Sequence, residues 1–169
     1  MPTKKKPEAP IGLDVGADAP NMTALDDAGN TVKLMDLAGE KGLALLFMRS
    51  VDWCSICKKQ TRLLGEISEQ MRGEGWPVAS LCYDSPDILA DFKEKHSLDF
   101  PMLSDENSAV IDAYALRNTR PKPGSRSVGI PHPAFVFIGT DGTVKQVLRE
   151  TNYMKRPQNE DVLAAAQAL

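Results

Sequence analysis

The chain has 169 residues, a net charge of -3, and 20 basic against 23 acidic side chains. This length suits a single domain that buries more than half of its surface, so folding requires neither disulfide cross-links nor metal. The slightly acidic balance argues against nucleic acid as a partner, and no apolar run approaches the roughly 20 residues that a membrane-spanning helix needs.

The segment 1–12 is predicted to be a disordered tail. Its first ten residues hold three lysines and three prolines but no apolar stretch, so it lacks the hydrophobic part of a secretory signal. We therefore expect a cytoplasmic protein with no membrane partner, whose folded domain covers 13–169. Within that domain, apolar segments between Leu13 and Leu34 flank the turn-forming residues Asp26–Asn30 and predict an N-terminal hairpin.

A strand, a CxxC motif and a helix are predicted next along the chain. The run Gly42–Met48 is continuously apolar, which is typical of a strand buried on both faces of a sheet. The motif Trp53-Cys54-Ser55-Ile56-Cys57 follows it closely. Apolar residues then recur at helical spacing and predict an amphipathic helix that ends near Gly73 and Gly75: Leu63, Leu64, Ile67 and Met71.

A second strand and helix follow. Trp76–Tyr83 predicts the strand, and Ser85 is an N-cap candidate for a helix over Ile88–His96, with a proline at its first position. Ser108–Leu116 predicts one or two further helical turns. The basic, Pro- and Gly-containing segment Asn118–Ser127 is expected to be an exposed loop where substrates or partners meet the protein.

The C-terminal part predicts a hairpin and a last helix. Strand patterns over Ala134–Ile138 and Thr143–Leu148 are separated by the turn-forming residues Gly139–Gly142, and Asn159–Ala168 has the acidic N-terminal residues typical of a helix start. Strands that alternate with helices and end in a hairpin indicate an α/β fold, with a mixed central sheet flanked by helices in three layers.

Four segments, spread over most of the chain in a fixed order, resemble one known family: Val15–Met22, Asp36–Gly39, Tyr83–Ser85 and Phe100–Asp105. The family is the alkyl hydroperoxide reductase/thiol-specific antioxidant family of peroxiredoxin-like redoxins, within the thioredoxin-like superfamily. The resemblance implies a thioredoxin-like sandwich and cysteine-based redox chemistry.

The residues around the cysteines depart from the peroxiredoxin pattern. In that family a Thr or Ser lies three residues, and a Pro seven residues, before the peroxidatic cysteine. The resemblance puts Cys57 at the peroxidatic position, with Cys54 replacing the hydroxyl and Ser50 replacing the proline, and the family's arginine falls on Pro133. The segment Trp53–Cys57 is instead similar to the thioredoxin motif, in which Pro133 takes the place of the cis-proline that faces the cysteines.

The spacing of Cys54 and Cys57 suits disulfide exchange. Cys54 is at the predicted start of a helix, where unpaired N–H groups and the positive end of the dipole favour a thiolate. Cys57 follows one turn later, within reach of a disulfide that releases substrate from a mixed disulfide. Lys58 and Lys59 either lower a thiol pKa further or are simply solvated. Thioredoxin-like sites often use a buried carboxylate as proton acceptor, for which three candidates are present: Asp26, Asp52 and Asp84.

The alternatives for the cysteine pair are a zinc half-site and two inert buried thiols. Zinc normally takes four ligands. Cys82, His96 and His132 are the remaining candidates, without a second cysteine pair, so we expect no metal and no cofactor beyond a Cys54–Cys57 disulfide. Cys82 ends an apolar strand, which favours a core thiol over a resolving cysteine.

Trp53, His132 and Pro133 are candidates for substrate binding or for tuning the thiols. Trp53 either packs over the disulfide and shapes a docking surface or anchors the loop in the core. Pro133 is expected to be cis, which would set the His132 backbone beside the sulfurs and let its imidazole tune their pKa or move a proton. The alternative is that Pro131 and Pro133 are both trans and lead into an edge strand.

Three functions are carried forward. The leading one is a thiol–disulfide oxidoreductase in which Cys54 attacks a protein disulfide, Cys57 resolves it, and an external thiol such as thioredoxin or glutathione restores the dithiol. The second is a thiol-dependent peroxidase that reduces hydrogen peroxide or alkyl hydroperoxides, with Cys57 peroxidatic. The third is a redox sensor or binding module whose disulfide state changes the loop Asn118–Ser127.

Overall fold

The computed structural model describes residues 10–150 and 155–169. Its strands are β1 (Thr23–Leu25), β2 (Thr31–Lys33), β3 (Gly42–Phe47), β4 (Val78–Cys82), β5 (Met102–Ser104), β6 (Ala134–Gly139) and β7 (Val144–Leu148). The helices are α1 (Ser55–Gly73), α2 (Pro86–Lys95), α3 (Ala109–Ala113) and α4 (Asn159–Ala168), with a 3-10 turn at Leu34–Leu37. Both predicted hairpins and the long helices are confirmed. β5 and the 3-10 turn were not predicted, because segments of three or four residues are too short to show a periodic pattern of apolar residues.

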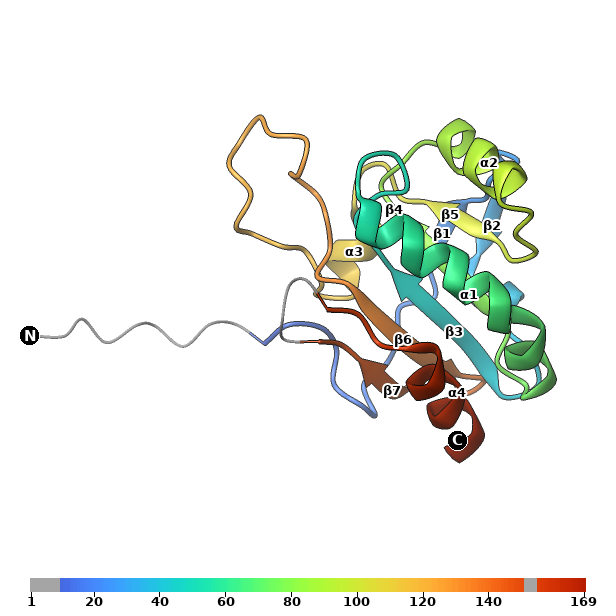
Figure 1. Ribbon diagram of the computed structural model, residues 1–169. Helices are drawn as coiled ribbons and strands as arrows, with labels where there is room; N and C mark the ends of the chain where they lie inside the picture. Colours follow the sequence, from blue (N-terminus) through green and yellow to red (C-terminus); the bar gives the residue numbers. More distant parts are fainter. Residues whose placement is uncertain (1–9, 151–154) are drawn as a thin grey trace, which may run out of the picture.

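The strands form one seven-stranded sheet in the order β2-β1-β5-β4-β3-β6-β7. β3, β4 and β5 are parallel neighbours, whereas the remaining pairs are antiparallel. Figure 1 shows α1 and α4 in front of this sheet and α3 behind it. The predicted α/β sandwich with a mixed central sheet is therefore confirmed.

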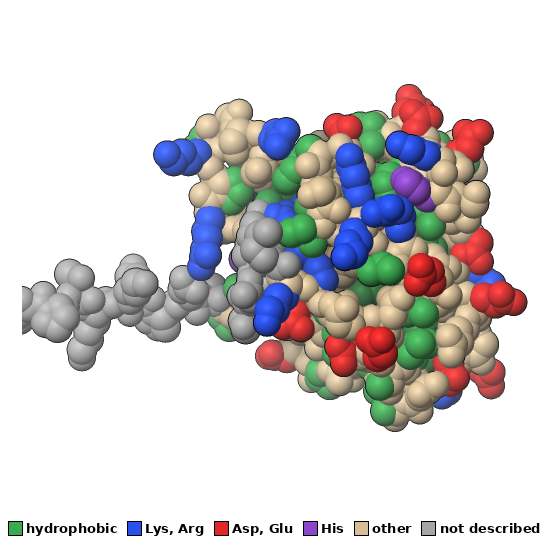
Figure 2. Space-filling model, viewed as in Figure 1, with side chains coloured by type: hydrophobic (Ala, Val, Ile, Leu, Met, Phe, Trp, Pro, Cys, Tyr) green, Lys and Arg blue, Asp and Glu red, His purple; other side chains and the backbone are tan. Residues whose placement is uncertain are grey.

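Charged side chains are unevenly distributed over the face that carries α1. Figure 2 shows Lys and Arg side chains gathered over the N-terminal half of α1 and over the loop between α3 and β6, whereas Asp and Glu lie mainly toward the lower and right-hand margins. In Figure 1 the same loop extends away from the sandwich, which confirms the predicted exposed connection. On this face, basic side chains thus cluster over the first half of α1, although the whole chain is slightly acidic.

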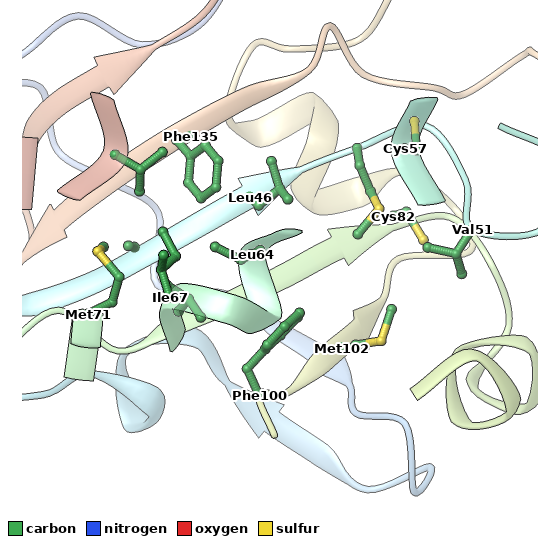
Figure 3. Close-up of a cluster of buried hydrophobic side chains, with 14 of the residues drawn as sticks. Leu46, Val51, Cys57, Leu64, Ile67, Met71, Cys82, Phe100, Met102 and Phe135 are labelled. Atoms are coloured by element: carbon green, nitrogen blue, oxygen red, sulfur yellow. The ribbon is translucent and has the colours of Figure 1, made fainter. Parts of the chain in front are cut away.

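Every residue of β3 is buried, because its side chains enter two core clusters on opposite faces of the sheet. One cluster contains Leu46 together with apolar side chains of α1, which Figure 3 labels: Leu64, Ile67 and Met71. The other contains Leu43, Leu45 and Phe47, together with the 3-10 turn and α3. Because β3 is fixed on both faces, its C-terminal end is a rigid point from which the chain leads into the CxxC motif.

Each end of α1 has a local cause. Cys54 is the N-cap residue, with extended backbone angles, and the chain leaves the helix through Gly75 at a φ of 84°. Glycine adopts this left-handed conformation without steric cost, so the predicted end near Gly73 and Gly75 is confirmed. For α2, Ser85 caps the helix through its hydroxyl, which accepts a hydrogen bond from the Ile88 N–H, and Pro86 follows at the first position.

The predicted N-terminal tail ends earlier than expected. Ile11 packs against one core cluster, and the Gly12 N–H donates to the Ala115 carbonyl at 2.8 Å. Residues 10–12 are therefore attached to the domain, and the rest of the predicted tail, 1–9, lies outside the described residues. Among the helices of the described ranges, none is long and apolar enough to cross a membrane.

Candidate active site

The loop between β3 and α1 is held by a buried carboxylate. Asp84, two residues beyond β4, accepts a hydrogen bond from the Ser50 hydroxyl and another from the Val51 N–H, each at 2.8 Å. The Ser50 hydroxyl in turn accepts from the Asp52 N–H at 2.9 Å. β3 and β4 are parallel, so their C-terminal ends meet at one edge of the sheet and Asp84 reaches the loop directly.

Both motif cysteines are free thiols at the start of α1. The Cys54 sulfur caps the helix by accepting the Cys57 N–H at 3.3 Å. Cys54 is 5% exposed, whereas Cys57 is fully buried beneath it. The predicted arrangement of two sulfurs one turn apart, with the first at the helix N-terminus, is therefore present, and Cys54 is the less deeply buried of the two.

The two thiols share a proton unequally. The pKa of Cys57 is lowered to about 5, chiefly by a hydrogen bond from the Cys54 side chain; N–H groups of Ser50 and Arg49 and the charge of Arg49 add to this effect and outweigh burial. The pKa of Cys54 is raised, because its S–H is engaged by Cys57 and because it is desolvated beside a negative sulfur. At neutral pH the reduced pair carries one thiolate, centred on Cys57.

The Arg49 side chain is a site residue that sequence reasoning missed. It is buried, and its positive charge lowers the pKa of both thiols. The sequence feature that could have identified Arg49 is its position: it is a charged residue directly after the apolar run of β3, where the chain leads to the cysteines. Arg49 therefore supplies a positive charge that acts on both cysteines.

Replacing Cys54 tests this account of the Cys57 thiolate. Serine at position 54 retains an O–H donor for the Cys57 sulfur, whereas alanine removes it. We expect the Cys57 pKa in Cys54→Ala to lie above that in Cys54→Ser by about one to two pH units, the value of one charge-assisted hydrogen bond. Titration of the thiolate ultraviolet absorbance measures both values, and identical midpoints in the two variants would contradict the proposed donor.

Trp53 connects the motif to the loop between α3 and β6. Its indole N–H donates to the Tyr83 hydroxyl at 2.8 Å, and the Arg126 guanidinium lies over its ring, 4.8 Å from the centroid. The Tyr83 hydroxyl donates in turn to the Arg126 carbonyl. Trp53 is half-buried, so it contributes both to the core and to a surface beside Cys54.

The three candidate carboxylates for the proton acceptor have different environments in the structure. Asp84 is buried, and burial raises its pKa. Asp26 instead organises the β1–β2 turn by accepting the N–H groups of Ala28 and Asn30, and Asp52 is exposed. Asp84 is therefore the buried carboxylate of this site.

Cys82 is a buried thiol of the core cluster that also contains Cys57. Its pKa is raised by burial and by the negative charge of Asp84. A thiol held protonated in this way is a poor nucleophile. In the described ranges, no group of three or more His, Cys, Asp or Glu side chains is arranged to hold a metal ion.

The expectation that Pro133 is cis is wrong: every peptide bond in the described part of the chain is trans. The physical reason is that this segment is already extended before β6 begins. Pro131 pairs with Arg117, and the His132 N–H donates to the Leu116 carbonyl at 2.7 Å. A trans bond continues this extended path, and it does not lead to an edge strand, because β6 lies between β3 and β7.

Pro133 and His132 nevertheless lie at the edge of the sheet that carries the motif. The next residue, Ala134, pairs with Phe47, so Pro133 is level with the end of β3. The His132 side chain lines two cavities beside Arg120 of the loop between α3 and β6, whereas Ile56 of the motif lines a third. A role of His132 in tuning the thiols remains a prediction.

Comparison with known proteins agrees with this geometry. The model of the AhpC/TSA family matches residues 15–147. The chain is 28% identical over 138 residues to the thiol-disulfide oxidoreductase ResA of Bacillus thuringiensis subsp. konkukian, covering 81% of this chain and 70% of that protein. It is 26% identical over 151 residues to peroxiredoxin Bcp of Escherichia coli, covering 89% and 93%.

Among solved structures, peroxidoxin BcpB of Mycobacterium tuberculosis superimposes with a TM-score of 0.79 at 19% identity, covering 94% of this chain and 98% of that one. This likeness confirms the thioredoxin-like fold. Since the family model spans most of the domain and both motif cysteines, the chain belongs to the AhpC/TSA family.

Proposed function

We propose that the protein is a thiol–disulfide oxidoreductase in which Cys54 attacks and Cys57 resolves. The observation that carries this assignment is the position of the Cys54 sulfur: it caps α1, it belongs to the less deeply buried of the two cysteines, and it lies one turn before the fully buried Cys57. A disulfide substrate can approach Cys54 but not Cys57. Membership of the AhpC/TSA family and similarity to both disulfide oxidoreductases and peroxiredoxins agree on cysteine-based oxidoreductase chemistry.

The hydrogen bond between the sulfurs provides the nucleophile. When the proton shifts from Cys54 to Cys57, the Cys54 thiolate attacks one sulfur of the substrate disulfide and forms a mixed disulfide, and the other substrate sulfur leaves as a thiolate. Cys57 then loses its proton to solvent. The Cys54 S–H is absent from the mixed disulfide, so the N–H groups of Ser50 and Arg49 and the charge of Arg49 favour this loss. The Cys57 thiolate attacks the Cys54 sulfur and expels the second substrate thiolate. The substrate disulfide is reduced to two thiols, and the protein dithiol is oxidised to a disulfide.

A complete cycle needs an external dithiol or two equivalents of a monothiol, such as thioredoxin or glutathione, to reduce the Cys54–Cys57 disulfide again. No cofactor beyond this disulfide enters the proposed reaction. A partner of this kind must reach Cys54 across the surface formed by Trp53 and the loop that contains Arg126. Tyr83 links Trp53 of the motif to the Arg126 carbonyl of that loop. A redox sensor, the third hypothesis, would use the same two hydrogen bonds to transmit the state of the cysteines to the loop.

A peroxidase is the second candidate, favoured by the surroundings of Cys57. The Cys54 S–H takes the place of the family's hydroxyl, and Arg49 supplies a positive charge near the sulfur. In that reaction the Cys57 thiolate attacks a peroxide oxygen, the second oxygen leaves as water or an alcohol after protonation, and a sulfenic acid forms. Cys54 then displaces water from Cys57 and forms the same intramolecular disulfide.

Parallel kinetics with the reduced protein distinguish the two functions. Stopped-flow fluorescence of the two tryptophans, Trp53 and Trp76, is followed after mixing with bis(2-hydroxyethyl) disulfide or with hydrogen peroxide, with Cys54→Ser/Cys57→Ser as the blank. We expect the second-order rate constant for the disulfide to exceed that for peroxide by at least about tenfold, because Cys54 is the less deeply buried of the two cysteines. Faster oxidation by peroxide would assign the peroxidase function instead, and slow reaction with both would favour the sensor.

A further inference from the structure

A cavity of about 570 Å³ opens directly beside the CxxC motif. It lies between the first half of α1, the start of β6 and the segment that leads into α4. Ile56, the residue just before Cys57, forms part of its wall, and apolar side chains line much of the rest: Leu63, Leu64, Phe135 and Pro157. A ligand in this cavity is therefore in contact with the motif itself, and its apolar walls favour a partner with an apolar face.

One polar side chain in this wall has no hydrogen-bond partner. Gln60, one turn after Cys57 on α1, is 8% exposed, and both its amide oxygen and its amide nitrogen are unpaired. Such a group is costly to bury, and it retains the capacity to donate and to accept at one place. Because Gln60 lines the cavity, a peptide group bound there offers the acceptor and the donor that its amide lacks.

The rim of the cavity is positively charged. A second cavity, of about 640 Å³, shares Glu150, Lys155 and Arg156 with the first and extends to the loop between α3 and β6. Among the described residues that line the two cavities, Glu150 is the only carboxylate, against six Lys and Arg side chains: Lys59, Arg120, Lys122, Arg149, Lys155 and Arg156. This imbalance in an acidic chain favours a negatively charged partner.

We propose that the two adjacent cavities, which share Glu150, Lys155 and Arg156, bind an extended, acidic segment of a disulfide-containing polypeptide, with the Gln60 amide pairing with its main chain. This inference rests on the proposed function and names its substrate class. Three properties are combined in one partner: apolar side chains for the walls, a peptide group for Gln60, and carboxylates for the rim. The bound segment lies beside Ile56, which brings a neighbouring disulfide to Cys54.

Short peptides that carry one mixed disulfide and glutamate, serine or lysine flanks test the proposal. Each is compared with bis(2-hydroxyethyl) disulfide, which has neither charge nor peptide group. We expect kcat/KM to be at least about tenfold higher for the acidic than for the basic peptide at low ionic strength, with most of this preference lost near 0.5 M salt. Lys155→Gln should reduce the preference, whereas Lys95→Gln, a matched change on α2, should not.

Gln60→Met tests the amide separately, because methionine has a similar size but cannot replace both hydrogen bonds. We expect the ratio of kcat/KM for any of the peptides to that for bis(2-hydroxyethyl) disulfide to fall about five- to tenfold, while the urea midpoint rises because an unpaired buried group is removed. Equal rates for acidic and basic peptides, or an unchanged ratio in Gln60→Met, would overturn the proposal. Failure of wild type to reduce bis(2-hydroxyethyl) disulfide would instead overturn the proposed function.

Discussion

Replacing Cys54 with serine is expected to lower the rate of disulfide reduction by at least about three orders of magnitude, because a serine hydroxyl is not ionised near neutral pH and cannot attack sulfur. Cys57→Ser is expected to retain the first attack and lose the second. Its mixed disulfide with the substrate should therefore persist at Cys54, where mass spectrometry detects one substrate half attached to the protein.

Cys82 provides the matched control for these two variants. Its sulfur is buried in the core and does not enter the proposed reaction, so Cys82→Ala should reduce disulfides at a rate close to that of the wild type. Disulfide reduction that survived in Cys54→Ser but vanished in Cys57→Ser would show that the attacking sulfur is Cys57. The assignment of roles to the two cysteines would then be wrong.

Asp84→Asn is expected to destabilise the reduced protein by about 2–4 kcal/mol. The Ser50 hydroxyl and the Val51 N–H donate to different carboxylate oxygens, asparagine keeps only one of them, and a buried donor left unpaired is costly. The amide nitrogen would also face one of these donors. Urea unfolding measures the loss. Asp52→Asn is the control on the same loop, where an exposed side chain should change stability by no more than about 0.5 kcal/mol.

The pH dependence of this difference has a definite sign. Burial raises the pKa of Asp84 in the folded protein, so the folded state takes up the proton at a higher pH than the unfolded state. As the pH falls through that raised pKa, proton uptake by Asp84 favours the folded wild type, whereas Asp84→Asn has no proton to take up at this position. The stability gap between wild type and Asp84→Asn should therefore widen as the pH falls through the raised pKa. A gap that is below about 1 kcal/mol at neutral pH would contradict the role of Asp84 in holding the loop.

Elements with strong local signals were predicted with nearly correct bounds. The buried run of β3, the apolar spacing of α1 and the Ser85 cap of α2 each depend on a few neighbouring residues. β5 was missed, since it consists of three residues and is defined by its pairing with β4 rather than by its own pattern. A sequence shows pairing of this kind only indirectly.

The site was predicted less completely than the fold, because its parts come from distant places in the chain. The CxxC motif is local and was found. Asp84 was one of three equal candidates until the parallel pairing of β3 and β4 placed it beside Ser50. Arg49 was missed, as its effect depends on where the strand ends in space. A cis bond at Pro133 was expected only from the similarity to the thioredoxin motif. The bond is trans, because the preceding residues are already extended and Pro131 pairs with Arg117.

The most direct test of the central claim is a peptide map of the protein after one turnover. Reduced protein is mixed with a limiting amount of bis(2-hydroxyethyl) disulfide, quenched by acid and alkylation, digested, and examined by mass spectrometry. The proposed reaction predicts a peptide in which Cys54 and Cys57 are joined by a disulfide, with Cys82 alkylated only after unfolding. A disulfide that includes Cys82, or a substrate adduct found on Cys57 rather than Cys54, would contradict it.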